Sequence, residues 1–333
     1  MKSGRLAAFA WGTLALNLGV VLWGAYVRAT GSGAGCGSHW PLCNGEVVPR
    51  APSVETIIEF SHRLSSGLAL LAVIALWLWS RRVYPSNHMV RRGARVALTF
   101  IVIEALLGAG LVLFELVAEN DSMLRAVSMV AHLLNTFILV GVLALTAWWA
   151  SGQTGRLTRG SRGAVPLLTA AAIGVLFVGA TGAIAALGDT LFPSASLEAG
   201  LRSSFSSDSH PLIQLRKYHP LAAILVGLAV VGTARYLARA SQNPLARKLA
   251  NILTGIYALQ LLAGTVNILL LAPVAMQLLH LLLADLLWIS LVLFGATVLT
   301  LDSGDGPESA NRDTLLNARR GAPNPATAGS GER

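Results

Sequence analysis

Residues 55–79 read ETIIEFSHRLSSGLALLAVIALWLW, a charged head that runs directly into a long apolar segment. The head places Glu59, His62 and Arg63 within five residues, at the start of what the apolar run predicts to be a membrane helix. Ionisable side chains are costly in hydrocarbon, so these three residues mark a candidate functional site. Glu59 and His62 are three residues apart and therefore share one face of a helix.

The composition is that of a polytopic membrane protein. Of 333 residues, 54% are hydrophobic and 12% are charged, whereas soluble domains carry about 25% charged residues. The formal net charge is +9, but the arginines fall in short clusters between apolar runs, as in the cytoplasmic loops of membrane proteins. No basic face with interleaved aromatic residues accompanies them, which argues against nucleic-acid binding.

Eight segments are long and apolar enough to cross a bilayer, which takes about 20 residues as a helix. Their runs are continuous rather than alternating, which indicates helices. They are predicted at residues 7–27, 58–80, 95–117, 126–150, 165–187, 218–240, 250–271 and 277–300. We expect an all-α membrane protein in which residues 1–150 and 165–300 each form a four-helix bundle, followed by a disordered cytoplasmic tail, residues 301–333.

Basic residues separate the second segment from the third, the fourth from the fifth, and the sixth from the seventh. By the positive-inside rule these loops face the cytoplasm, as do both termini of this expected multi-pass plasma-membrane protein. The clusters are Arg81, Arg82, Arg91, Arg92 and Arg95; Arg156, Arg159 and Arg162; and Arg235, Arg239, Arg247 and Lys248. The predicted outer loops are residues 28–57, 118–125, 188–217 and 272–276.

Cys36 and Cys43 fall in the first outer loop, on the oxidising side of the membrane, where a disulfide persists. Six residues separate them, in a stretch rich in turn-forming glycines. We expect a disulfide rather than two free thiols. It is either a plain staple of the loop or a clip that responds to redox conditions.

Four histidines recur at corresponding places in the two halves. His62 and His219 are 157 residues apart, and His132 and His280 are 148 apart. Each begins an even-numbered segment, and every even-numbered segment enters the membrane from the outer side. The four imidazoles are therefore expected at similar depth, a turn or two below the outer surface.

Short sequence matches accompany this repeat. Ala29-Thr30-Gly31 recurs as Ala180-Thr181-Gly182, and Glu104-Ala-Leu-Leu-Gly resembles Gln260-Leu-Leu-Ala-Gly. An even number of helices per half preserves their direction, so the halves are expected to be related by a pseudo-twofold axis along the membrane normal.

Two helices of each half present one histidine each at one level. This is the geometry that clamps an iron porphyrin between the helices of a bundle. Copper or zinc also accepts imidazole, but nothing else in either half supplies a third ligand symmetrically, which favours haem. A single histidine in a membrane helix is often only hydrogen-bonded to a neighbour, but four at repeated positions are harder to explain in that way.

The halves also differ. Aligning His62 with His219 places Arg216 where Glu59 stands and Pro220 where Arg63 stands. Two electron-transfer haems would not need this asymmetry. It suggests that one haem only transfers electrons and that the other is itself chemically changed.

Several of these motifs resemble the heme A synthase family, over about residues 7–300. They are Glu59-Phe-Ser-His62-Arg63, the paired cysteines after Arg28-Ala-Thr-Gly-Ser-Gly, Ala131-His132-Leu-Leu-Asn135-Thr136, and Gln277-Leu-Leu-His280. The resemblance implies oxidation of the C8 methyl of heme O to the formyl group of heme A, for cytochrome oxidase, by an oxidoreductase with resident haem b. It also implies a membrane electron acceptor and contact with membrane lipid, with heme O synthase (protoheme farnesyltransferase) and with oxidase assembly.

The resemblance also implies roles for individual residues. Glu59 would be the catalytic carboxylate, and Arg63 would help to bind the substrate. The iron of heme O would lie between His62 and His132, and the iron of haem b between His219 and His280. His219 departs from the family pattern because no arginine follows it.

Other polar residues have plainer interpretations. Glu104 and Asp285 are candidate buried acids, for which a hydrogen-bonded contact between helices is an equally good explanation. His39, His88 and His210 lie in predicted loops and are expected to be solvated. Two other functions stay open for the whole chain: a dihaem b-type cytochrome that passes electrons from a quinol, and a haem carrier or transporter.

Overall fold

The computed structural model describes residues 2–153, 163–241 and 243–300. Within these ranges eight spans are long and apolar enough to cross a membrane, and no strand is found, so the predicted all-α fold is confirmed. The long helices are α1 (Lys2–Ala29), α2 (Val54–Val83), α3 (Met89–Leu113), α4 (Met123–Ala150), α5 (Ala164–Leu191), α8 (Tyr218–Ala240), α9 (Pro244–Leu269) and α10 (Val274–Leu299). The tail 301–333 and the cluster Arg156, Arg159 and Arg162 lie outside the described residues.

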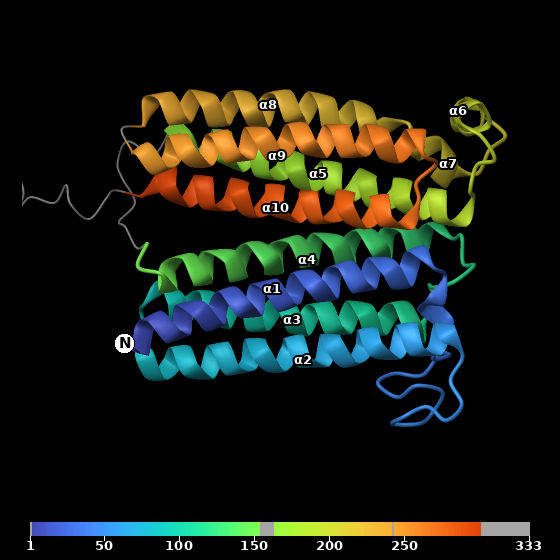
Figure 1. Ribbon diagram of the computed structural model, residues 1–333, viewed down its shortest axis with the longest axis horizontal. Helices are drawn as coiled ribbons and strands as arrows, with labels where there is room; N and C mark the ends of the chain where they lie inside the picture. The colour runs from blue at the N-terminus through green and yellow to red at the C-terminus, as the bar shows by residue number, and fades with distance from the viewer. Residues whose placement is uncertain (1, 154–162, 242, 301–333) are drawn as a thin grey trace, which may run out of the picture.

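The helices form two groups (Figure 1). Helices α1–α4, here the N-terminal unit, pack on one another, as do α5 and α8–α10, the long helices of the C-terminal unit. Helix α4 contacts α5 and α10, and α1 also contacts α10, so the two units share one continuous core. At this seam the ring of Trp288 stacks on Phe137, and its Nε1 donates a 2.6 Å hydrogen bond to the Phe137 carbonyl oxygen.

Short polar side chains define where helices begin. Ser53 precedes α2 and accepts a hydrogen bond from the Thr56 backbone N–H, and Ser122 caps α4 in the same way. His88 and His210 cap α3 and the short helix α7 (Pro211–Arg216) through Nδ1. Both were expected to be merely solvated, and both have structural roles instead.

The predicted outer loop at residues 188–217 contains two short helices that the hydropathy pattern did not indicate. These are α6 (Leu197–Phe205) and α7, and α7 leads directly into α8. The junction between α7 and α8 lies at Lys217, three residues before Pro220. Proline has no backbone N–H to bond the carbonyl of Arg216 and clashes with it, which explains the interruption of an otherwise continuous span, Pro211–Ala240.

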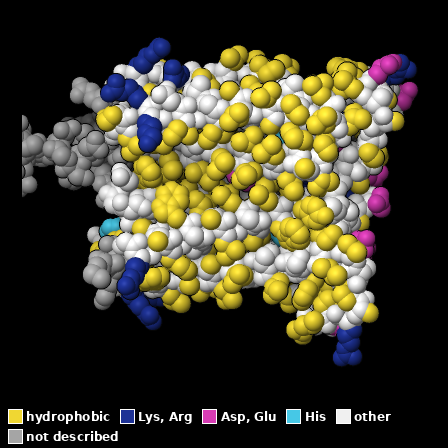
Figure 2. Space-filling model, viewed as in Figure 1, with side chains coloured by type: hydrophobic (Ala, Val, Ile, Leu, Met, Phe, Trp, Pro, Cys, Tyr) yellow, Lys and Arg dark blue, Asp and Glu magenta, His cyan; other side chains and the backbone are white. Residues whose placement is uncertain are grey.

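The surface has the character expected of a protein embedded in lipid. Apolar side chains cover the long sides of the molecule in the face shown in Figure 2. Lys and Arg gather mainly at the end that carries the N-terminus, and acidic side chains lie mainly at the opposite end. Together with the eight apolar spans, this identifies a multi-pass membrane protein.

Candidate functional site

The four predicted histidines lie near one end of the helices, here the disulfide end, where the loop with Cys36 and Cys43 is found. His62 is the ninth residue of the span Val54–Val83, and His219 is the ninth residue of Pro211–Ala240. The two histidines are thus equally far along the sequence of their spans, although His219 is the second residue of α8, just after the interruption at Lys217.

Each of these histidines packs against a glycine on a neighbouring helix. A Cβ atom placed on Gly24 would lie 2.9 Å from His62 Cε1, and one on Gly182 would lie 3.0 Å from His219 Cε1. Real Cβ atoms do not approach another atom so closely without displacing it, so the imidazole occupies space that only glycine leaves free.

The second histidine of each unit repeats this contact. A Cβ on Gly264 would lie 2.9 Å from His280 Cε1, and one on Gly108 would lie 3.9 Å from His132 Cε1. The glycines come from α1 and α3 in one unit and from α5 and α9 in the other. The contacts correct the earlier match of Ala29-Thr30-Gly31 with Ala180-Thr181-Gly182, because Gly24 is the counterpart of Gly182.

His219 and His280 face each other in the C-terminal unit. Their ring centroids are 6.2 Å apart and the ring planes are nearly perpendicular. A metal–imidazole bond is about 2 Å long, so two such bonds and the half-widths of two rings match this spacing. The Thr181 hydroxyl lies 3.1 Å from His219 Nδ1, which leaves the Nε2 atom of that ring for a metal. Gln260 Nε2 lies 3.3 Å from His280 Nε2.

His62 in α2 and His132 in α4 are the corresponding histidines of the N-terminal unit. The Nδ1 atoms of both are buried and have no hydrogen-bond partner in the described part of the chain. Buried polar atoms are normally satisfied, so such atoms are typical of a site that takes a ligand. His132 Nδ1 points toward a carboxylate, with Glu104 Oε1 3.6 Å away.

Glu104 is fixed on α3 by two side chains of α4. The Asn135 amide donates one hydrogen bond to Glu104 Oε2 and a second, of 3.0 Å, to the Phe100 carbonyl oxygen. The Thr136 hydroxyl lies against Glu104 Oε1 and shares its one proton between that atom and the His132 carbonyl oxygen. Glu104 thus makes the expected polar contact between helices, but it does so beside a candidate ligand. The other candidate acid, Asp285, is fully buried in α10 and neither carboxylate oxygen has a partner among the described residues.

Glu59 lies under the disulfide loop. Its side chain is almost completely buried, and Oε2 accepts a 2.8 Å hydrogen bond from the Cys36 backbone N–H. Oε1 accepts hydrogen bonds from Nε and Nη2 of Arg63, one helical turn later. Both oxygens are therefore engaged, and the carboxylate anchors the loop to α2.

Arg63 completes this anchor. Its Nη1 donates 2.6 Å hydrogen bonds to the carbonyl oxygens of His39 and Leu42, so four of its five N–H groups are used within the loop and by Glu59. The predicted disulfide between Cys36 and Cys43 closes the same loop. Gly35 permits the close approach, because a Cβ there would lie 2.4 Å from the Glu55 carbonyl carbon.

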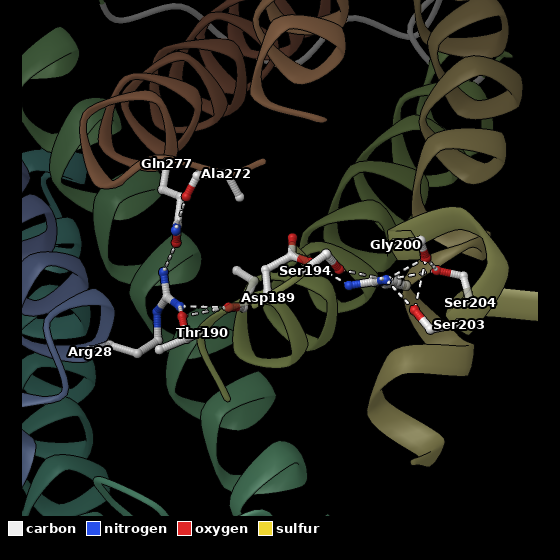
Figure 3. A network of polar contacts seen from close by, with 11 residues as sticks. Arg28, Asp189, Thr190, Ser194, Gly200, Ser203, Ser204, Ala272 and Gln277 are labelled. Atoms are coloured by element: carbon white, nitrogen blue, oxygen red, sulfur yellow. Dashed lines mark hydrogen bonds and ion pairs between the residues drawn. The ribbon is translucent and has the colours of Figure 1, made fainter. Parts of the chain in front are cut away.

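Arg216 has the position of Glu59 in the C-terminal unit and also holds a loop, the one between α5 and α8. Its guanidinium donates to Asp189 Oδ1 at 3.0 Å and to the Gly200 carbonyl and the Ser204 hydroxyl of α6 (Figure 3). The residue three before the first histidine therefore anchors a loop in both units, as a carboxylate in one and a guanidinium in the other. Sequence alignment found the substitution of Glu by Arg but not their common role.

Arg28 joins the units and was not singled out as a functional residue by the sequence. Its guanidinium donates to the Ala186 carbonyl oxygen and the Thr190 hydroxyl of α5, and to Gln277 Oε1 of α10, at 2.7–2.8 Å (Figure 3). In the sequence, a lone arginine at the end of an apolar segment looks the same whether it binds a lipid headgroup or, as here, joins two helical units.

A family model described as cytochrome oxidase assembly protein (COX15-CtaA) matches residues 7–292. The chain belongs to this family. The match covers both histidine pairs and the disulfide loop, and it confirms the resemblance to heme A synthases found in the sequence.

Relatives of this family member carry two different names. A protoheme IX farnesyltransferase of Thermus thermophilus is 51% identical over 316 residues, which are 93% of this chain and 52% of that protein. The chain thus spans about half the length of that relative. Heme A synthases of Alkalihalophilus pseudofirmus and Halalkalibacterium halodurans are 48% and 47% identical over 97 residues, 28% of this chain and 32% of each relative.

The residues of this family member fit haem. His219 and His280 lie 6.2 Å apart, glycines give the imidazoles room, and three of the four rings have an unsatisfied buried Nδ1. A metal held by protein side chains alone fits less well, because no cluster of three or more His, Cys, Asp or Glu residues occurs in the parts of the chain that the structure covers.

Proposed function

We propose that this protein is a heme A synthase, which oxidises the C8 methyl of heme O to the formyl group of heme A for cytochrome oxidase. The observation that carries the proposal is an asymmetry between two otherwise similar histidine pairs. Glu59 stands one turn from His62, and Glu104 Oε1 lies 3.6 Å from His132 Nδ1, whereas no carboxylate is in contact with His219 or His280 in the described residues; the buried Asp285 lies five residues after His280 in α10. The C-terminal pair has the amide of Gln260 instead.

In this proposal His219 and His280 hold haem b as the resident cofactor. Held by these two imidazoles, the haem would supply electron transfer. The Thr181 hydroxyl fixes the orientation of His219, and Gly182 and Gly264 leave room for the two rings. These side chains bind and orient the cofactor and do not enter the reaction.

The N-terminal pair would hold heme O as substrate, with His62 and His132 bracketing its iron. Oxidation of a methyl group on the ring develops positive charge beside the macrocycle. A fixed carboxylate stabilises such charge or accepts the proton that is released. Glu59 is preorganised for this because the Cys36 N–H and the Arg63 guanidinium hold its two oxygens. Arg63 fixes the carboxylate and the loop, and keeps one N–H group for the substrate.

The distribution of charged side chains supports an orientation for the protein in the membrane. The arginine-rich end carries the N-terminus, which supports cytoplasmic termini and a plasma-membrane location. The disulfide loop and both histidine pairs then lie toward the outer face, where a membrane electron acceptor would take the electrons. A relative named protoheme IX farnesyltransferase contains a match to nearly this whole chain in about half its own length. This supports contact between this chain and the enzyme that makes heme O, within oxidase assembly.

The experiment is pigment extraction from protein purified after co-expression with a heme O source, followed by mass spectrometry of the porphyrins. We expect haem b together with heme O or heme A. His280→Ala should remove haem b, since a single imidazole holds the iron weakly. Haem b as the sole pigment would instead identify an electron-carrying dihaem cytochrome, a function that the well-formed His219–His280 pair also supports.

A further inference from the structure

Glu104 and Gln260 occupy equivalent places in the two units. Each lies four residues before the glycine that holds the second histidine of its unit, Gly108 in α3 and Gly264 in α9. Each also reaches a histidine, but at a different ring nitrogen: Glu104 Oε1 lies 3.6 Å from Nδ1 of His132, and Gln260 Nε2 lies 3.3 Å from Nε2 of His280. One position therefore carries a carboxylate beside one iron site and a neutral amide beside the other.

The residues that fix Glu104 belong to the N-terminal unit only. Asn135 and Thr136 follow His132 by three and four residues and hold the two carboxylate oxygens. At the same distances after His280 stand Leu283 and Ala284, which have no polar side-chain atoms. The carboxylate and its supporting side chains thus form a set that the C-terminal unit does not repeat.

Glu104 and Glu59 also differ in whether a basic side chain lies beside the carboxylate. Arg63 forms an ion pair with Glu59, whereas no lysine or arginine pairs with Glu104 in the described ranges. Glu104 is therefore a carboxylate without a cationic partner in contact with a histidine of the pairs.

A carboxylate next to the Nδ1 atom of a ligating histidine has known physical effects. At 3.6 Å the contact between Glu104 and His132 is not yet a hydrogen bond. With the ring turned to hold a metal, the carboxylate would accept the Nδ1 proton, leave Nε2 for the metal, fix the plane of the ring and make the imidazole a stronger donor. A stronger donor and a nearby negative charge stabilise the higher oxidation state of iron, which lowers its reduction potential. An amide supplies neither the charge nor the same increase in donor strength.

We propose that Glu104 is a positioning residue that lowers the reduction potential of the iron held by His62 and His132 below that of the iron held by His219 and His280. The difference directs an electron from the N-terminal iron, which goes from ferrous to ferric, to the C-terminal iron, which goes from ferric to ferrous. This inference rests on the proposed function, because it requires a haem at each histidine pair.

The test is a potentiometric titration of the purified protein followed by absorption, with Glu104→Gln and Gln260→Glu compared with the wild type. Glu104→Gln should raise the midpoint potential of the N-terminal iron alone, and Gln260→Glu should lower that of the C-terminal iron alone. Glu198→Gln, on the exposed surface of α6, is the matched control and should shift neither. Because Gln260→Glu leaves the N-terminal unit native, it keeps the test valid if Glu104→Gln folds poorly.

Measuring haem retention in Glu104 variants distinguishes the effect of the negative charge from the effect of the hydrogen bond. Glu104→Leu removes the acceptor and should weaken haem retention at the N-terminal pair about 10- to 100-fold, the usual effect of losing a partner of a metal ligand. Glu104→Gln should restore retention but not the potential. Two bound haems with unchanged potentials in both charge variants would overturn the inference and leave the proposed function standing. A wild-type protein with iron at one pair alone would overturn both.

Discussion

Gly24, Gly182 and Gly264, which make the tight contacts with histidines, are the residues on which the site geometry depends most directly. Gly264→Ala should push His280 away from its present position, because the new Cβ would lie 2.9 Å from the ring. We expect loss of the low-spin spectrum of haem b, measured by absorption of the purified protein.

Gly108→Ala is the matched control for this change. Its Cβ would meet His132 at 3.9 Å, an ordinary contact, so the haem complement should be retained. Without a clash, replacing glycine by alanine inside a helix stabilises it by about 1 kcal/mol. A Gly264→Ala protein that gains stability and keeps its haem b would show that the glycine does not position His280.

Glu59 combines two roles that a pair of substitutions can separate. Glu59→Ala should stop heme A formation, since loss of one preorganised charged group costs roughly a hundredfold or more in rate. It should also free the Cys36 N–H and Arg63, and so loosen the loop, while haem b stays bound at the other pair. Extraction of porphyrins should find heme O accumulated beside normal haem b.

Glu59→Gln keeps an oxygen for the Cys36 N–H but removes the negative charge. We expect it to hold the loop and still fail to make heme A. Wild-type heme A formation by Glu59→Gln would restrict Glu59 to anchoring the loop, and undiminished heme A in Glu59→Ala would remove it from the reaction altogether.

Among the elements, the loop between α1 and α2 depends most on a single covalent bond. Cys36 and Cys43 are both buried and joined by a disulfide. A bond across so short a loop contributes about 2 kcal/mol by restricting the unfolded chain. Without reductant, a thiol reagent should label neither cysteine in detergent-solubilised protein.

The Cys36→Ser, Cys43→Ser double variant should be cut faster by protease within residues 36–50. The C-terminal unit should keep its haem b, because it makes no use of this loop. Quantitative labelling of both thiols in the untreated protein would contradict the disulfide.

Apolar length predicted the helices well but not their ends. All eight spans were found because about 20 apolar residues have no other stable structure in lipid. The ends depend on local chemistry that hydropathy ignores, as with the Ser53 cap, which begins α2 four residues before the apolar run predicted from residue 58. Helices α6 and α7 were missed because they are short and lie in a polar loop.

At the scale of the whole molecule, the units are locked together by the seam between α4 and α10. Gly141 lies under Trp288, and a Cβ there would be 2.9 Å from Trp288 Nε1. Gly141→Val should therefore overfill the seam and destabilise the protein by about 1–3 kcal/mol. The fall in apparent melting temperature should exceed that of Gly255→Val in α9, whose Cβ would meet nothing within 4 Å.

The candidate site was predictable to the extent that it repeats. His62, His132, His219 and His280 were found because an imidazole in a membrane helix is rare and four at matching intervals are rarer. Their glycine partners were missed because glycine is common in membrane helices and carries no chemical signal of its own. The contact between Glu104 and His132 joins α3 to α4, so only the packing of those helices reveals it.

Both loops at the disulfide end are held by an ion pair, Glu59–Arg63 for one and Arg216–Asp189 for the other, but only the first is also closed by a disulfide. If that face meets the external medium, the two loops respond differently to the habitat of the cell. A reducing medium loosens the first loop and leaves the second intact. Strong acid that protonates Glu59 and Asp189 weakens both ion pairs, and the disulfide then keeps the first loop closed while the second has no covalent support.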